Sequence, residues 1–318
     1  MSMPRPELDP ELSARLVGMP LGTTINADIL AQMRQYKMPV EAYLEGRSVE
    51  RREVEISTAD GHILPLSIFR PGGATTENAP CIYWVHGGGM VMGDRFANLD
   101  IPLEWLERFG ATVVTVDYRL APEASGATLV EDCYAGLAWV ASHAEELGVA
   151  LSHIIVAGAS AGGGLVAGMT LMARDRSGPA IAAQILICPM LDHRNDTLSS
   201  RQYAGEPGVW TREKNAFGWQ SVLGSADSAE VSPYISAALA TDLSGLPTTY
   251  IDAGTAEVFR DEDTSYASRI WAAGGQAELH IWAGGFHGFD AMFPDAALST
   301  AARQARTAWL ARFLGISA

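Results

Sequence analysis

Residues 153–168 read HIIVAGASAGGGLVAG, and this stretch decides the fold. An apolar run typical of a buried strand leads into small residues around Ser160, and a run rich in glycine and alanine follows. A strand that turns abruptly into a helix strains the turn residue, and small neighbours let the two elements approach. The serine hydroxyl then projects above the sheet, beside helix amides that favour negative charge. The stretch predicts a nucleophile turn, although a glycine-rich loop with an incidental serine would contain the same pentapeptide.

Further apolar runs of buried-strand type alternate with helical stretches along the chain. The runs are residues 81–85, 112–116, 185–187, 249–251 and 279–282, and the helical stretches include 129–147, 261–273 and 301–314. This alternation predicts a parallel sheet with helices on both faces. Upstream, residues 54–57 and 63–69 alternate around Asp60-Gly61, which predicts a hairpin and makes the sheet mixed. The fold class is therefore α/β.

Two segments fall outside the alternation. Residues 1–50 are polar and helical in character, with apolar residues at helical spacing at Ile29, Met33 and Tyr36 and again at Val40, Tyr43 and Leu44. Residues 190–240 have no clear strand, but they carry Trp210, Phe217 and Trp219. A long insertion after a strand's carboxyl end usually covers the ligand crevice. We expect a lid with these three aromatic residues in the pocket wall, with an ordinary surface excursion as the alternative.

The composition disfavours nucleic acid and membranes as partners. The chain has 318 residues, 48% of them hydrophobic, and a formal net charge of −15, which disfavours nucleic acid and anionic membrane surfaces. No apolar run approaches a membrane span, and residues 1–7 hold no hydrophobic stretch of signal-peptide type. The three cysteines, Cys81, Cys133 and Cys188, are isolated, which fits a reducing compartment. We therefore expect a soluble cytoplasmic protein.

Motifs for cofactors and metals are absent from the sequence. It contains no GxGxxG opening a helix, no GxxxxGK[ST] and no HExxH, and its cysteines and histidines form no cluster at metal-ligand spacing. We expect neither a cofactor nor a metal.

A serine nucleophile needs a base and a group that orients the base. Of the seven histidines, His287 follows the last predicted strand in the glycine-flanked loop 284–289, where an imidazole can reach over the sheet. His193 is a weaker rival. The third group should be an acid between Ser160 and His287 in the chain. Glu257, beyond a strand among small and apolar residues, is the first choice and Asp252 the second.

The developing oxyanion needs donors as well. Residues 86–89 read HGGG and directly follow the strand 81–85. Glycines let backbone amides point at a negative charge without a Cβ in the way. We expect the amides of Gly87, Gly88 and Ala161 to form an oxyanion hole, although three glycines after a strand can also be a tight turn.

The HGGG run, residues 117–123 (DYRLAPE), the Ser160 turn and residues 287–289 (HGF) together resemble the bacterial hormone-sensitive-lipase family of α/β-hydrolases. The likeness extends from about residue 54 to the C-terminus. It implies an eight-stranded sheet, a cap built from the N-terminal segment plus the insertion after the sixth strand, and hydrolysis of carboxylic esters. Many members dimerise through the last strand and neighbouring helices, so the resemblance allows a homodimer.

The chain departs from the family pattern near two site residues. Ala159 stands where the family usually has an aspartate before the serine. Glu257 stands where the family usually has the triad aspartate, and its side chain is one methylene longer. The resemblance divides the chain into a cap of residues 1–50 and 190–240 and a catalytic domain of residues 51–189 and 241–318. The expected enzyme is a carboxylesterase for short- to medium-chain esters that works through an acyl-enzyme. An amidase or lactonase with the same triad, or a non-catalytic receptor on the same fold, are the alternatives.

Overall fold

The computed structural model describes residues 3–73, 77–225 and 230–316, so parts of the N-terminal segment (1–2) and of the insertion (226–229) lie outside the described residues. Over these residues the chain forms one sheet of eight strands in the order β1-β2-β4-β3-β5-β6-β7-β8. The strands are β1 Val49–Ser57, β2 Ile63–Pro71, β3 Ala79–Val85, β4 Thr112–Val116, β5 Val149–Ala159, β6 Ala183–Ile187, β7 Thr248–Ala256 and β8 Ala277–Phe286.

The strand directions confirm the predicted mixed sheet. β1 and β2 form the antiparallel hairpin around Asp60-Gly61, and β2 pairs antiparallel with β4. The remaining neighbours pair in parallel. The carboxyl ends of β3, β5, β6, β7 and β8 therefore meet at one edge of the sheet, where ligand sites of such folds form.

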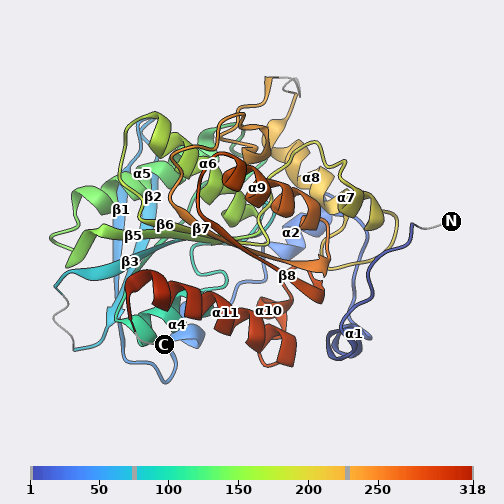
Figure 1. Ribbon diagram of the computed structural model, residues 1–318, viewed down its shortest axis with the longest axis horizontal. Coiled ribbons are helices and arrows are strands. Elements are labelled where there is room, and N and C mark those ends of the chain that lie inside the picture. The colour runs from blue at the N-terminus through green and yellow to red at the C-terminus, as the bar shows by residue number, and fades with distance from the viewer. Residues whose placement is uncertain (1–2, 74–76, 226–229, 317–318) are drawn as a thin grey trace.

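Helices cover both faces of the sheet (Figure 1), with α5, α6 and α9 on one face and α4, α10 and α11 on the other. The helices are α1 Pro10–Leu16, α2 Ala27–Met33, α3 Val40–Leu44, α4 Asp100–Phe109, α5 Thr128–Ser142, α6 Ala161–Asp175, α7 Leu198–Gln202, α8 Arg212–Leu223, α9 Arg260–Ala272, α10 Phe289–Met292 and α11 Ala297–Leu314. Among the described residues, none of the helices is long and apolar enough to cross a membrane.

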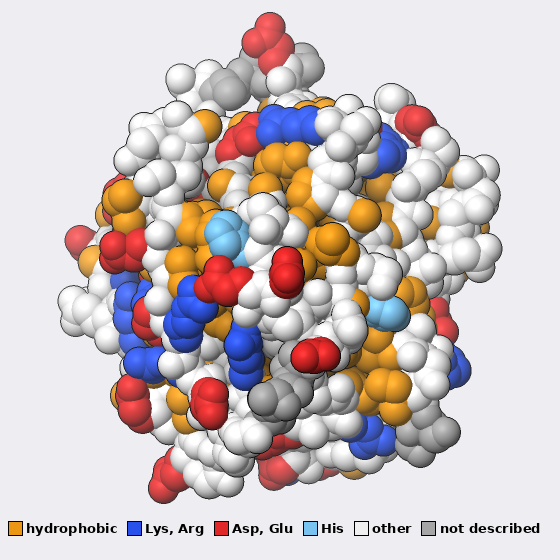
Figure 2. All heavy atoms as spheres, turned by 90° about the vertical axis from the view of Figure 1, so that its left-hand side faces the viewer, with side chains coloured by type: hydrophobic (Ala, Val, Ile, Leu, Met, Phe, Trp, Pro, Cys, Tyr) orange, Lys and Arg blue, Asp and Glu red, His pale blue; other side chains and the backbone are white. Residues whose placement is uncertain are grey.

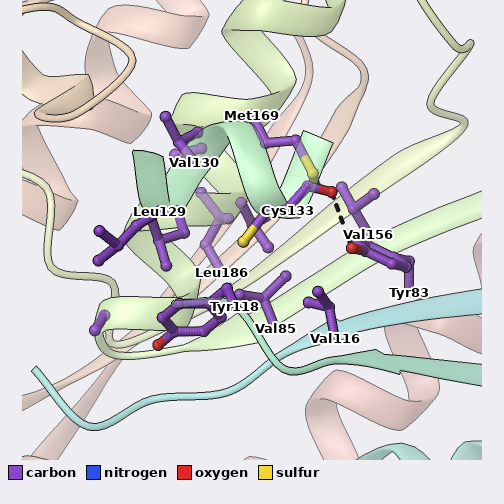
Figure 3. Packing of buried hydrophobic residues seen from close by; sticks show 14 of the residues in the cluster. Tyr83, Val85, Val116, Tyr118, Leu129, Val130, Cys133, Val156, Met169 and Leu186 are labelled. Carbon is purple, nitrogen blue, oxygen red and sulfur yellow. Dashed lines mark hydrogen bonds between the residues drawn. The ribbon is translucent and has the colours of Figure 1, made fainter. Parts of the chain in front are cut away.

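The continuous apolar runs arise because each strand buries both of its faces. In β3, Cys81, Tyr83 and Val85 belong to the cluster under α5 and α6, whereas Ile82 and Trp84 belong to the cluster under α4 and α11. Figure 3 shows the first cluster, in which the buried Tyr83 hydroxyl donates a hydrogen bond of 2.9 Å to the carbonyl of Cys133 in α5. The two packed faces fix where the strand ends lie.

The N-terminal segment and the insertion lie together at the carboxyl edge, where α1, α2, α7 and α8 gather at the right-hand end of Figure 1. The Asp9 amide donates to the carbonyl of Gly284 near the end of β8 over 3.0 Å. The side chain of Gln202 in α7 donates to the Pro4 carbonyl over 2.6 Å. Two segments almost 200 residues apart thus cover the same end of the sheet.

The apolar residues at helical spacing near residue 30 do not form the buried face of α2. The helix buries Leu30, while Ile29 is 37%, Met33 39% and Tyr36 89% exposed. The helix ends at Met33, which lines the cavity described below, and Leu30 is the one of its side chains that joins the core. The second group of apolar residues does pack: α3 places Val40 in the cluster beneath α4 and α11.

Figure 2 shows the opposite end of the molecule, the left-hand side of Figure 1. Basic side chains on this face lie next to acidic ones and form no continuous basic surface. This mixture agrees with the acidic net charge and gives nucleic acid no attractive surface on that face.

Candidate active site

Ser160 occupies the strained turn that the sequence predicts between β5 and α6. Its backbone has φ 55° and ψ −120°, a region that residues with a Cβ rarely adopt. The Ser160 amide donates to the Ile187 carbonyl over 2.7 Å, and its carbonyl accepts from the amides of Gly164 at 3.0 Å and Met190 at 2.9 Å. These bonds to β6, to α6 and to the chain after β6 hold the serine in its strained conformation.

Small residues around the turn are required by close backbone contacts. A Cβ on Gly162 would lie 2.1 Å from the Val85 carbonyl oxygen, and one on Gly158 would lie 2.5 Å from the carbonyl of Gly162. Helix α6 can therefore begin directly against the ends of β3 and β5. Ala161 is its first residue, so the Ala161 amide has no acceptor within the helix.

The structure brings Ser160, His287 and Glu257 together. His287 follows the last residue of β8 and Glu257 follows the last residue of β7. His287 Nε2 lies 2.9 Å from Ser160 Oγ, and His287 Nδ1 lies 2.6 Å from Glu257 Oε2. Because a carboxylate only accepts, Nδ1 carries the proton and Nε2 is free to accept the serine proton. The added methylene of glutamate therefore reaches the imidazole.

Packing holds the imidazole in this orientation. The ring of Phe259 meets the His287 ring edge-on with centroids 5.0 Å apart, and the Trp210 ring lies 6.1 Å from it. The second oxygen of Glu257 accepts the Gly254 amide over 2.7 Å. Both Glu257 and His287 are buried, with 1% and 8% of their surface exposed.

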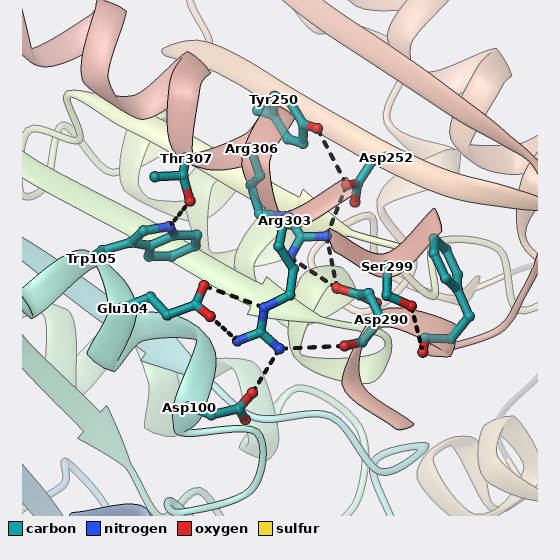
Figure 4. A network of polar contacts seen from close by, with 11 residues as sticks. Asp100, Glu104, Trp105, Tyr250, Asp252, Asp290, Ser299, Arg303, Arg306 and Thr307 are labelled. Atoms are coloured by element: carbon teal, nitrogen blue, oxygen red, sulfur yellow. Dashed lines mark hydrogen bonds and ion pairs between the residues drawn. The ribbon is translucent and has the colours of Figure 1, made fainter. Parts of the chain in front are cut away.

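Asp252 and His193, the second choices for acid and base, lie elsewhere. Asp252 accepts a hydrogen bond from Arg306 over 2.8 Å and one from the Tyr250 hydroxyl over 3.3 Å. Figure 4 shows this buried network, in which Arg306 also binds Asp290. Burial raises the pKa of Asp252 despite the guanidinium beside it. His193 lies beside Ser236 in the insertion.

The HGGG loop lies against Ser160. Gly87 and Gly88 line the same cavity as Ser160, and a Cβ on Gly87 would lie 3.4 Å from the Ser160 Cβ. His86 anchors the loop: its buried ring stacks on Tyr118 with centroids 4.2 Å apart, and its Nδ1 lies 2.7 Å from the Gly87 carbonyl oxygen. Burial lowers the pKa of His86, so the ring is neutral at neutral pH and donates this hydrogen bond.

A cavity of about 310 Å³ opens above Ser160 and His287. Trp210 lines it, whereas Phe217 and Trp219, which we also expected in the wall, do not. Trp219 is 2% exposed and packs in the core, edge-on to His193. Trp210 precedes α8, and among the described residues none of α8 lines this cavity, so aromatic residues within the helix do not reach it.

Trp210 separates this cavity from a second one of about 320 Å³, which lies beside the N-terminal segment and is lined by Leu8, Leu16 and Phe286 among others. Val209, Trp210 and His287 border both cavities. A Cβ on Gly89 would lie 2.3 Å from the Trp210 ring, so the indole rests directly on the HGGG loop.

Fold and site define a hydrolase with a serine, a histidine and a carboxylate in hydrogen-bond sequence. A family model described as alpha/beta hydrolase fold matches residues 82–291, and the chain belongs to that family. The resemblance to bacterial hormone-sensitive-lipase-like enzymes is thereby confirmed.

Several relatives are similar over most of the chain. Carboxylesterase NlhH of Mycobacterium tuberculosis is 33% identical over 86% of each chain. Among solved structures, a bacterial heroin esterase has a TM-score of 0.89 and 35% identity, covering 96% of this chain and 98% of its own. Esterase LipW of Mycobacterium marinum has a TM-score of 0.86 and 30% identity, covering 98% of both chains.

Proposed function

We propose that the protein is a carboxylesterase that cleaves short- to medium-chain esters through an acyl-enzyme. The observation that carries the proposal is the hydrogen-bonded sequence from Ser160 through His287 to Glu257 at the base of a cavity. The similarity to enzymes named carboxylesterase and esterase supports it.

The reaction has two halves that use the same groups. Ser160 Oγ attacks the ester carbonyl while His287 Nε2 takes its proton, and the imidazolium then protonates the leaving alcohol. Water repeats the sequence to release the acid and restore the serine. Glu257 holds the proton on Nδ1 and stabilises the charged imidazolium. A positioned base of this kind contributes roughly 10²–10⁴-fold to the rate.

The amides of Gly87, Gly88 and Ala161 are proposed to bind the oxyanion. The two glycines border the cavity at Ser160, and the Ala161 amide belongs to the open first turn of α6. Loss of one such donor typically costs about 3–4 kcal/mol of transition-state stabilisation.

The cavity supports the size of the proposed substrate. About 310 Å³ is at the lower end of the range for small-molecule sites. Met92, Ile101 and Val209 make much of its wall apolar, which suits an acyl chain.

The cap is also a proposal. The segments that gather over the carboxyl edge, around α1, α2, α7 and α8, are consistent with a cap built from residues 1–50 and 190–240 on a catalytic domain of residues 51–189 and 241–318. Because α3 packs against the catalytic core, we place the end of the first cap segment before residue 40.

The decisive experiment compares Ser160→Ala with Ser152→Ala, an exposed serine at the other end of β5. We expect Ser160→Ala to lose hydrolysis of p-nitrophenyl butyrate and labelling by a fluorophosphonate, and Ser152→Ala to keep both. Near-normal hydrolysis by Ser160→Ala would mean that the nucleophile is misassigned. Wild type that is folded but takes no label would favour a non-catalytic receptor.

Matched substrates distinguish the remaining alternatives. An ester, an amide and a lactone with the same acyl group should rank with the ester first in kcat/KM. A dominant amide or lactone rate would change the proposed activity while leaving the triad in place.

A homodimer and a cytoplasmic location are further proposals. β8 is an edge strand of the sheet and its neighbour α11 lies at the surface, which offers a second copy an edge to pair with. The three cysteines are buried and free, as in a reducing compartment. Light scattering of purified protein and fractionation of cells that produce it test these two points.

A further inference from the structure

Cys188 lies beside Glu257 and His287, and no spacing in the sequence indicates this. One sulfur, one carboxylate oxygen and one imidazole nitrogen, from Cys188, Glu257 and His287, all lie within 4.8 Å of one another. Among the residues that the structure describes, these form the one group of three such donors found. They are 69 and 30 residues apart in the chain and meet only because β6, β7 and β8 are adjacent parallel strands that end at the same edge.

The fold holds the thiol in this place. Cys188 follows the last residue of β6 with a φ of 37°, and its amide donates to the Asp252 carbonyl over 2.6 Å. The residue is 5% exposed and lines the cavity that contains Ser160 and His287. Cys188 therefore belongs to the wall of the cavity that a small ion would enter.

The surroundings favour a cation. Burial raises the pKa of the Cys188 thiol well above its ordinary value, and the nearby carboxylates of Glu257, Asp290 and Asp252 raise it further. The same carboxylates that disfavour a thiolate attract positive charge. Arg306 is the cation that binds Asp252 and Asp290, and it makes no ion pair with Glu257 among the described residues.

We propose that Cys188, Glu257 and His287 form an inhibitory site for a thiophilic divalent cation such as Zn²⁺ or Cd²⁺. A thiolate, a carboxylate and a neutral imidazole supply two negative charges and the donor types that these ions prefer. Bond lengths of about 2.0–2.3 Å place tetrahedral ligands roughly 3.5 Å apart, so side-chain shifts of about 1 Å close the site. Solvent in the cavity completes the coordination.

Coordination explains inhibition through the histidine. Binding releases the thiol proton to solvent and forms a sulfur–metal bond. If the metal takes Nδ1, the one proton of the neutral ring moves to Nε2, which then donates to Ser160 instead of accepting its proton. If the metal takes Nε2, the base is occupied outright. Either way Ser160 loses its general base.

The test uses cadmium chloride alone as the probe, with magnesium chloride as a hard-cation control. We expect Cd²⁺ to inhibit wild-type ester hydrolysis reversibly, with recovery on adding EDTA, and Mg²⁺ to have no effect at the same concentration. Cys188→Ala and Cys188→Ser, each compared with its own metal-free rate, should need at least tenfold more Cd²⁺. Cys133→Ala, which removes a buried thiol elsewhere, should behave as wild type.

A second readout does not need activity. Cd²⁺ bound by a thiolate adds an ultraviolet charge-transfer band, which we expect in wild type and in Cys133→Ala but not in Cys188→Ser. The inhibition, though not the binding, rests on the proposed function, so a protein without esterase activity would still give the band if the site is correct. Equal inhibition of wild type and both Cys188 variants, or an unchanged band in Cys188→Ser, would overturn the proposal.

Discussion

Arg306 offers the sharpest test of how the site is supported. Its buried guanidinium lies 2.8 Å from Asp252 and 3.1 Å from Asp290, which is three residues beyond His287 (Figure 4). Arg306→Met removes the positive charge and leaves two buried carboxylates without their cation. Breaking a buried ion pair from one side costs about 3–5 kcal/mol, and we expect a loss of unfolding free energy in that range at neutral pH.

The loss of unfolding free energy in Arg306→Met should increase as the pH rises. Burial already raises the pKa of Asp252 with Arg306 present, and Arg306 opposes that rise. Without the guanidinium the pKa rises further, so the folded variant binds a proton that the unfolded chain, with a carboxyl pKa of about 3.9, releases. A raised pKa means that stability is lost as the pH rises, by up to about 1.4 kcal/mol per pH unit for each proton. The gap between wild type and variant should therefore be small near pH 4 and large at pH 7.

Urea unfolding followed by tryptophan fluorescence at pH 5 and pH 7.5 measures both effects. Arg312→Met is the matched control, because Arg312 lies on the same helix and its side chain, 59% exposed, pairs with Glu278. It should lose less than about 1 kcal/mol at either pH. A loss below about 1 kcal/mol for Arg306→Met, or one that is equal at both pH values, would refute the reasoning.

Three further predictions follow from the same geometry. Glu257→Gln should lower kcat by roughly 10⁴-fold, as loss of a triad acid does, and Asp252→Asn by far less; the opposite ranking in p-nitrophenyl butyrate assays would exchange their roles. Asp263 is buried with no hydrogen-bond partner on either oxygen among the described residues, and burial raises its pKa. Asp263→Asn should therefore gain stability over wild type as the pH rises from about 4 toward the raised pKa of the folded state, by up to about 1.4 kcal/mol per pH unit, and a pH-independent difference in urea titrations would contradict this. Trp210→Ala should join the two cavities beside His287 and raise kcat/KM for octanoyl relative to butyryl esters severalfold; an unchanged ratio would show that the indole does not limit chain length.

Much of the fold could be predicted because its strands are buried on both faces. The run 112–116 (TVVTV) is β-branched throughout, all five of its residues are buried, and β4 has those bounds. The ends of other strands were missed: β7 continues to Ala256 through Asp252 and Gly254, where composition indicates a loop. The neighbouring strands β6 and β8 supply hydrogen-bond partners there, and local sequence does not contain that information.

The candidate site could be predicted where the order of the residues in the chain and the positions of the strand ends identify them. Ser160, Glu257 and His287 each follow directly on a strand, and parallel strands bring such positions together. The pocket wall was not predictable in the same way. Trp210 precedes α8 and meets the cavity, but Trp219 lies within α8, and the helix turns that residue toward the core.

The sequence does not indicate that several acidic residues near His287 are buried. Glu257, Glu262 and Asp263 lie within seven residues, and all three are buried. They differ in their hydrogen bonds. Each oxygen of Glu257 accepts one, from Gly254 and His287, and one oxygen of Glu262 accepts two, from the amides of Leu191 and Asp192. Neither oxygen of Asp263 accepts any among the described residues. Burial raises the pKa of both Glu262 and Asp263 well above the ordinary range, and the two backbone amides oppose that rise only at Glu262. Donors stabilise a buried negative charge, and of these three acids Asp263 is the one that lacks them on both oxygens. Of the three acids, Glu257 is the one whose carboxylate lies against the imidazole of His287, which is where the proposed mechanism needs it.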